Sequence, residues 1–368
     1  MKSSFVVMLA ALAMLAETVG CSKNSRDQGS SQSEHKDSLV VPRNTVLAGN
    51  EGDIHQSAES VNLGISVDSL SQASSPENDS STSTYFGLYV LRADKMQGRD
   101  YHEVLLVGRC SEAGFRALKD EDEPTSETLP SLPSALIFKH HRAFVPFYSG
   151  KPLGQCSVSR VSIGSFDCSN LVVGLSSPPE PIPSNSPTLD RAGFAAGKEQ
   201  EYSLSFAFVI EAPWFQTHLA KPSLVPPIFV SDRASRVLTQ YCYDEFRKSI
   251  RALPDTSCKV SAIRPYLVGE DTAYVLTAVA RTDSIVLSLA IAACIKDHTV
   301  EPKLEVSNTN EPDSWGSGHV LLDVLDIDGD GNAELVFMVG YYEATGIEIY
   351  KLEGEKYKRV FDALPWGC

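Results

Sequence analysis

The chain has 368 residues, of which 42 % are hydrophobic and 21 % are charged, and its formal net charge is −15. This is the composition of a globular protein with enough apolar residues for one large or two modest domains. Because phosphate binding needs clustered Lys and Arg, the acidic balance argues against nucleic acid, and we expect no nucleic-acid partner.

Residues 1–20 have the anatomy of an export signal peptide. Lys2 precedes an apolar run from Phe5 to Leu15, and small residues lead to Cys21. The run is too short to span a bilayer. The sequence "ETVGC" resembles the lipobox of bacterial lipoproteins, which implies that Cys21 carries a lipid and that the membrane is a partner through it. By the family's sorting pattern, Ser22 implies the outer membrane, facing the periplasm or the surface. Ordinary cleavage, giving a soluble secreted protein, is the alternative.

Residues 21–84 are predicted to be a disordered, Ser-rich tether. No Phe, Tyr or Trp occurs between Phe5 and Tyr85, so the segment lacks the apolar area that would offset its ordering entropy. Two mildly apolar patches in this segment, 38–42 and 61–67, are candidates for an additional edge strand.

From Tyr85 onward the pattern predicts a mainly β fold of antiparallel meanders with one long helix. Short β-rich runs occupy 85–93, 102–110, 135–150 and 157–176, and an acidic loop covers 119–133. A proline-rich loop at 176–188 suggests two β-rich subdomains, 85–180 and 190–368. Residues 204–210 alternate strictly and predict a half-buried strand.

The helix is predicted over 231–253. Ser231 or Asp232 can cap its start, and Pro254 follows its end. Its apolar stripe comprises Val237, Leu238, Tyr241, Phe246, Ile250 and Leu253. Further strands are expected after it, including the apolar run 284–295.

An acidic turn, "DIDGDGNAE" at 326–334, lies between two apolar runs. Oxygen donors at its first, third and fifth positions converge when the backbone wraps tightly, and the glycines permit that wrapping. Carboxylates at close range repel one another unless a hard cation neutralises them, and oxygen-only ligation selects Ca²⁺. An EF-hand is excluded because Phe337 stands at position twelve, where that motif needs an acidic residue.

The turn resembles the D-x-D-x-D-G-x-x-[DE] hairpin of FG-GAP and VCBS-type repeats, which lies between two strands of a propeller blade. The resemblance covers the hairpin 319–361 and implies a four-stranded, propeller-blade-like meander. It also implies a structural Ca²⁺, held by the side chains of Asp326, Asp328, Asp330 and Glu334 and by the backbone carbonyl of Asn332. An acidic hairpin without an ion is the alternative.

The chain has eight cysteines, and seven remain once Cys21 is assigned to the lipid. No C-x-x-C or zinc-type spacing occurs, so in an exported protein disulfides are expected. Spacing does not determine connectivity; our guess is Cys156–Cys168, Cys242–Cys258 and Cys294–Cys368. Cys110 is left over and is a candidate link to another chain in a larger cell-surface complex. Buried, reduced cysteines are the alternative.

No catalytic motif is recognisable, and no catalytic residue is assigned. His140 and His141 are expected at a surface turn, and Glu211, Glu270 and Asp271 are scattered acids that a fold could bring together. The tryptophans and C-terminal tyrosines suggest either core packing or a face for a glycan or peptide; they are Trp214, Trp315, Trp366, Tyr341, Tyr342 and Tyr350.

The sequence therefore favours an exported, membrane-anchored lipoprotein that is a non-enzymatic binding or envelope-structural protein, with a cell-envelope protein or glycan as its partner. The alternative is an exported hydrolase, directed at glycans or esters, without a local motif.

Overall fold

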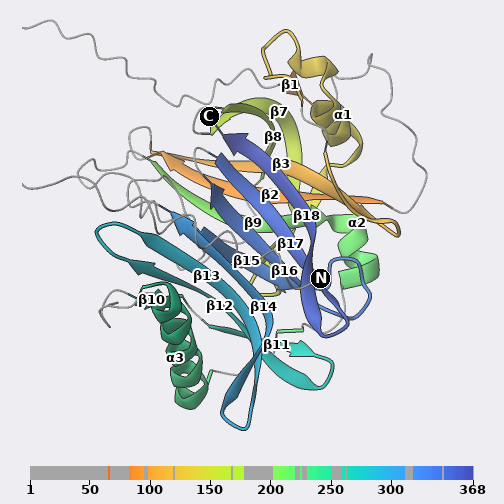
Figure 1. Ribbon diagram of the computed structural model, residues 1–368. Coiled ribbons are helices and arrows are strands. Elements are labelled where there is room, and N and C mark those ends of the chain that lie inside the picture. Colours follow the sequence, from red (N-terminus) through yellow and green to blue (C-terminus); the bar gives the residue numbers. More distant parts are fainter. Residues whose placement is uncertain are drawn as a thin grey trace, which may run out of the picture. The chain divides into compact units, whose positions relative to one another are not determined.

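The protein is described here from a computed structural model (Figure 1). The described residues are 65–66, 83–94, 98–118, 121–166, 169–177, 202–219, 224–225, 230–250, 258–261, 263–310, 318–341 and 344–367. All of them belong to one compact unit, Gln56–Cys368. The predicted signal peptide, Cys21 and most of the predicted tether lie outside the described residues.

The first sheet has nine strands, all paired in the antiparallel sense. They are β1 (Ile65–Ser66), β2 (Thr84–Asp94), β3 (Arg99–Ser111), β4 (Gly114–Ala117), β5 (Ala143–Tyr148), β6 (Lys151–Pro152), β7 (Cys156–Phe166), β8 (Ser169–Ser176) and β9 (Tyr202–Glu211). The order is β1-β7-β8-β3-β2-β9-β5-β6, and β5 also pairs with β7, so β7, β8, β3, β2, β9 and β5 form a closed ring. The edge strand β1 lies in the apolar patch 61–67.

Strand β9 is buried on both faces, which corrects the prediction of a half-buried strand. Phe206, Phe208 and Ile210 enter one core cluster, whereas Ala207 and Val209 enter the other. The reason is its position between β2 and β5. It also follows that a strand of the predicted second subdomain lies in the middle of the first sheet, so the proline-rich loop does not separate two sheets.

The second sheet is covered by a helix. Its strands are β10 (Cys258–Val260), β11 (Arg264–Val268), β12 (Asp271–Arg281), β13 (Val286–Lys296) and β14 (Thr299–Asn310). Helix α3 (Asp232–Ser249) packs Leu238, Cys242 and Phe246 against one face of this sheet. Ser231 caps the helix, because its side chain accepts a hydrogen bond from the Ala234 N–H at 3.1 Å.

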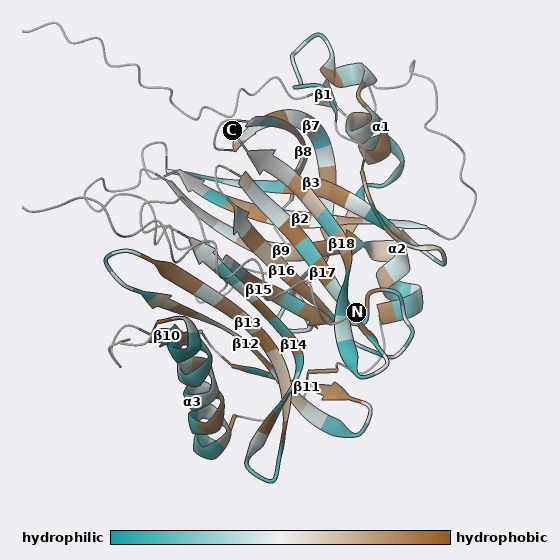
Figure 2. Cartoon of the chain, viewed as in Figure 1, coloured by the Kyte–Doolittle hydropathy of each residue, from teal (hydrophilic) through white to brown (hydrophobic). Residues whose placement is uncertain are grey.

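The C-terminal sheet is a four-stranded antiparallel meander in chain order. Its strands are β15 (Gly318–Leu325), β16 (Glu334–Tyr341), β17 (Ala344–Glu353) and β18 (Lys356–Gly367). Residues such as Val336 and Met338 face the first sheet, and Leu335 and Phe337 face the second. This sheet is therefore the middle layer, with apolar side chains on both faces (Figures 1 and 2).

The structure corrects two parts of the predicted fold. Residues 135–140, the first part of the strand expected over 135–150, belong to helix α1 (Pro133–His140). A short helix α2 (Ala212–Trp214) is followed by the π-helical turn η3 (Phe215–Leu219). A 3-10 turn, η2 (Leu129–Ser131), precedes α1. The described residues thus hold three α-helices where the sequence predicted one, and α3, which lies within the predicted range 231–253, already ends at Ser249. The C-terminal meander stands as predicted, but a propeller is not shown.

Helix α1 was missed because its sequence has no helical period. Ala135, Leu136, Ile137 and Phe138 are consecutive and all buried. A short apolar run of this kind does not by itself distinguish a buried strand from a buried helix. Pro133 at the first helical turn is the local signal that favoured the helix.

Candidate metal centre

The acidic turn connects β15 to β16, and its aspartate side chains accept hydrogen bonds from backbone N–H groups of the same turn. The Asp326 carboxylate accepts a hydrogen bond from the Gly331 N–H at 2.9 Å, and that of Asp328 accepts one from the Asp330 N–H at 3.3 Å. Gly329 and Gly331 have φ of 78° and 93°, a conformation that glycine adopts without strain. The wrapped turn predicted from the sequence is present.

Three of the five predicted ligands come together. One carboxylate oxygen each from Asp326, Asp328 and Glu334 lies within 4.8 Å of the others. Asp330 is outside this group, and its carboxylate accepts the Asn332 N–H at 2.8 Å. That the Asn332 carbonyl is a ligand stays a prediction.

Glu334 is the buried member of the group. Its side chain is fully inaccessible, one carboxylate oxygen accepts the Ile327 N–H at 2.6 Å, and the other, Oε1, has no hydrogen-bond partner. Burial, together with the negative charges of Asp328 and Asp326, raises the pKa of Glu334 to about 9. A buried carboxylate oxygen without a donor, beside two further carboxylates, fits a hard cation such as Ca²⁺.

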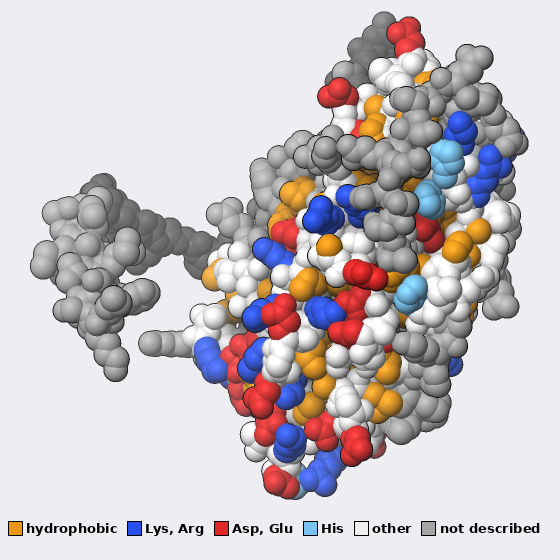
Figure 3. All heavy atoms as spheres, turned by 90° about the vertical axis from the view of Figure 1, so that its right-hand side faces the viewer, with side chains coloured by type: hydrophobic (Ala, Val, Ile, Leu, Met, Phe, Trp, Pro, Cys, Tyr) orange, Lys and Arg blue, Asp and Glu red, His pale blue; other side chains and the backbone are white. Residues whose placement is uncertain are grey.

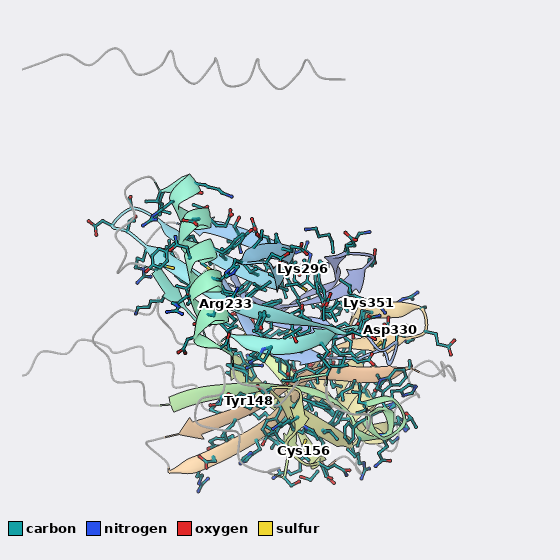
Figure 4. The ribbon with its side chains drawn as sticks, turned by 90° about the horizontal axis from the view of Figure 1, so that it is seen from below. Tyr148, Cys156, Arg233, Lys296, Asp330 and Lys351 are labelled. Carbon is teal, nitrogen blue, oxygen red and sulfur yellow. The ribbon has the colours of Figure 1, made fainter. Side chains whose placement is uncertain are left out.

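Lys351, on β17, is the site residue that the sequence analysis missed. Its ammonium forms an ion pair with Asp328 and a second one with Asp330 at 2.8 Å. Figure 4 shows Lys351 and Asp330 side by side at one edge of the molecule. Partial burial lowers the pKa of Lys351, but its hydrogen bonds to the two aspartates outweigh this effect and raise the pKa above its usual value.

Strand register explains how Lys351 reaches the turn. Leu335 pairs with Tyr350 across β16 and β17, so the adjacent residues, Glu334 and Lys351, come together where the turn ends and β16 begins. In the sequence, the only indication of this contact was a lysine in the strand after β16. The sequence does not give the strand register, so it did not show that this lysine reaches the acidic turn.

The turn is anchored to the core through its backbone. The Trp214 indole N–H donates to the Ile327 carbonyl at 2.8 Å, and the Tyr357 hydroxyl donates to the Ala333 carbonyl at 3.1 Å. His218 stacks on Trp214 with ring centroids 3.8 Å apart. The contacts come from helix α2 on one side and strand β18 on the other, so the turn joins elements distant in sequence.

A groove of about 790 Å³ opens beside the turn. It is bordered by Asp328, Asp330 and Lys351, by the Trp214–His218 stack and by the β3–β4 turn. On the face of the molecule shown in Figure 3, acidic and basic side chains of the described residues lie interspersed over the lower half.

The scattered acids do not form one site. Glu211 is buried on β9, where it accepts a hydrogen bond from the Thr84 hydroxyl at 3.0 Å and pairs with His141. Glu270 and Asp271 are exposed in the β11–β12 turn of the second sheet. His140 is exposed at the end of helix α1, and His141 directly after it is partly exposed, so the two histidines lie between a helix and a strand and not between two strands.

Three of the six aromatic residues singled out above have described side chains, and these are buried or partly buried. Trp214 is buried, and Tyr341 and Tyr350 donate hydroxyl hydrogen bonds to Glu348 at 2.8 and 2.5 Å. This favours core packing for these three. The side chains of Trp315, Tyr342 and Trp366 lie outside the described residues.

The cysteines of the described residues carry free thiols. They are Cys110, Cys156, Cys242, Cys258 and Cys294. The bond expected between Cys242 and Cys258 is not formed in this structure. Cys168 and Cys368 lie outside the described residues, so the pairings proposed for these two stay predictions. Cys110 is fully buried, and burial raises the pKa of its thiol to about 12. It is therefore not placed to link two folded chains.

Comparison with known proteins adds no family to this picture. The chain matches no protein-family model, no curated protein and no solved structure. Among the described helices, none has the length and apolar character needed to cross a membrane.

Proposed function

We propose that the chain is an exported, membrane-anchored lipoprotein that serves as a non-enzymatic binding or envelope-structural protein, with a Ca²⁺ ion stabilising its β15–β16 turn. One observation supports the ion above all others. Glu334 is fully buried, its Oε1 has no hydrogen-bond partner, and it belongs to a group of carboxylates that also includes Asp326 and Asp328.

The donor set fits a hard divalent cation. All three side chains offer oxygen, which suits Ca²⁺ and disfavours zinc or copper. The role is structural, because the carboxylates lie within one turn whose backbone is held by Trp214 and Tyr357. An ion at this position would stiffen the junction between α2 and the C-terminal sheet.

Thermal unfolding of the full-length chain tests the ion. Calcium binds only the folded turn, so a concentration of 100 times Kd should add about 2.7 kcal/mol of stability and raise the melting temperature. Glu334→Gln keeps an acceptor for the Ile327 N–H but removes the buried charge, and it should abolish the rise. Glu270→Gln, at an exposed turn, is the matched control and should respond like the wild type. A rise of equal size in Glu334→Gln would refute the site.

The membrane anchor rests on the signal-like residues 1–20 and on Cys21. We expect metabolic incorporation of palmitate into the wild-type chain and its loss in Cys21→Ala, with fractionation to the outer membrane. Cys110→Ala should be labelled normally. Labelling that survives in Cys21→Ala would exclude this anchor and would favour the soluble secreted form.

An exported hydrolase is the second candidate, and the His141–Glu211 pair favours it. A buried carboxylate that orients a partly exposed imidazole is an arrangement used in general-base catalysis. Turnover of ester or glycoside substrates by the full-length chain, lost in His141→Gln, would establish the enzyme. The absence of turnover with both substrate classes would leave the non-enzymatic function.

A further inference from the structure

The ammonium of Lys351 already occupies part of the acidic turn. It pairs with Asp328, which belongs to the three-carboxylate group, and with Asp330 at 2.8 Å. A cation that binds Asp328 therefore meets a positive charge on the same carboxylate. Two positive charges that share one carboxylate are close enough to repel strongly. The metal ion and the ammonium therefore cannot both stay on Asp328 without a large energetic penalty.

We propose that Lys351 is a built-in competitor of the metal ion: its ammonium neutralises the turn when no ion is bound, and a divalent cation displaces it. This inference rests on the proposed calcium site. In the ion-free form Asp328 and Asp330 keep a counter-charge, so the turn stays folded. In the ion-bound form the ammonium leaves Asp328.

The surroundings allow this displacement. The Lys351 side chain is 23 % exposed, and its long, flexible stem borders the open groove beside the turn. The released ammonium can enter this groove, which is open beside the turn. The buried oxygen Glu334 Oε1 has no hydrogen-bond partner, so the ammonium satisfies the outer part of the cluster and leaves the inner part unsatisfied.

The exchange gives the site a threshold. Any cation must bind more strongly than the tethered ammonium, and a monovalent ion has no charge advantage over it, whereas Ca²⁺ has twice the charge. Lys351 therefore sets both the affinity of the turn and its selectivity for divalent ions.

Two variants of the full-length chain test the proposal by isothermal titration with calcium chloride. Lys351→Met removes the competitor and should tighten calcium binding by about tenfold or more. Lys358→Met is the matched control, because Lys358 faces Lys351 across β17 and β18 but pairs with Glu353 at 2.7 Å. Its affinity for calcium should stay close to that of the wild type.

A direct readout follows the ammonium itself. Acetylation of Lys351, quantified by mass spectrometry of the wild-type chain, should speed up when calcium is added, while acetylation of Lys358 should not change. In chelator, Lys351→Met should melt below the wild type, and calcium should raise its melting temperature by more than that of the wild type.

The outcomes separate this inference from the proposed function. Equal calcium affinity in wild type and Lys351→Met, or unchanged acetylation of Lys351 on binding, overturns the competitor and leaves the site. Binding to Lys351→Met alone supports the competitor and refutes calcium binding by the natural chain. Binding to neither overturns both.

Discussion

Two buried glutamates of the C-terminal sheet, Glu334 and Glu348, lie in opposite surroundings. Glu348 is 3 % exposed and accepts hydrogen bonds from Tyr341 and Tyr350, while His319 and Arg359 contact it at 3.1 and 2.5 Å. Glu334 is equally buried, yet only one of its oxygens has a donor. The number of donors, more than burial, separates a carboxylate that is part of the core from one that fits a cation.

The pKa values of the two carboxyls express this difference. Burial raises the pKa of Glu348, but its hydrogen bonds with His319, Tyr350, Tyr341 and Arg359 outweigh burial and lower the pKa to about 2. For Glu334, burial and the neighbouring aspartates both raise the pKa, to about 9. One carboxylate stabilises the fold in its charged form, and the other opposes the fold when charged.

The largest expected effect belongs to Glu348→Gln. Removing the charge leaves buried donors without a strong acceptor, so the free energy of unfolding near neutral pH should fall by about 3–5 kcal/mol. Because the folded pKa lies below the unfolded value, the contribution of Glu348 is present above pH 4.5 and is lost as the pH falls toward 2. Urea denaturation of wild type and variant between pH 2 and 7 measures this. A deficit that does not change with pH would contradict the assignment.

Asp323 sharpens the comparison as an intermediate case. It is fully buried on β15 and accepts the Gly150 N–H at 2.6 Å, and Arg264 lies 3.8 Å away. Burial outweighs the effect of Arg264 and of the backbone donors and raises the pKa of Asp323 to about 6. Its stabilising contribution is therefore full below pH 3.8 and is lost as the pH rises through 6.

The test of Asp323 is the variant Asp323→Asn. A shift of about two pKa units corresponds to about 3 kcal/mol, so the stability of the wild type relative to this variant should fall by about that amount between pH 4 and 7. The sign is opposite to that expected for Glu348→Gln. Parallel pH profiles for wild type and Asp323→Asn would show that Asp323 is not buried as described.

Glu334→Gln should act in the opposite direction to Glu348→Gln when calcium is absent. Because its pKa is about 9 in the folded chain, Glu334 must take up a proton on folding at neutral pH, and this lowers stability. The variant removes that cost and keeps an acceptor for the Ile327 N–H, so stability in chelator at pH 7 should rise by about 2 kcal/mol. Equilibrium unfolding in urea with chelator present measures the change. A loss of stability as large as that of Glu348→Gln would remove the distinction between the two glutamates.

The smallest expected effect is that of Trp214→Phe. The variant keeps an aromatic ring but leaves the buried Ile327 carbonyl without its donor, which should lower the free energy of unfolding by about 1 kcal/mol. His218→Ala removes the stacked ring and retains that hydrogen bond, so it should have a smaller effect. If His218→Ala were the more damaging of the two, stacking would be what anchors the turn.

The comparison also shows where the sequence was sufficient. The turn 326–334 was predictable because its aspartates bond to backbone N–H groups within five residues and its glycines supply positive φ. The start of α3 was predictable for the same local reason, since the Ser231 side chain accepts a hydrogen bond from the N–H of Ala234, three residues later. Helix α1 was not, because four consecutive buried residues carry no period.

By itself, therefore, the sequence determined the mainly β character, the wrapped acidic turn, the capped helix and the C-terminal meander. Only the tertiary structure decided that β9 lies in the middle of the first sheet, that Glu211 meets Thr84 127 residues away, and that Lys351 enters the acidic turn. Burial and strand register depend on which strands pair at long range, and local patterns in the sequence do not specify those pairings. These pairings also determine how many hydrogen-bond donors reach Glu334 and Glu348, and the shortage of donors at Glu334 is what makes the candidate site suitable for a cation.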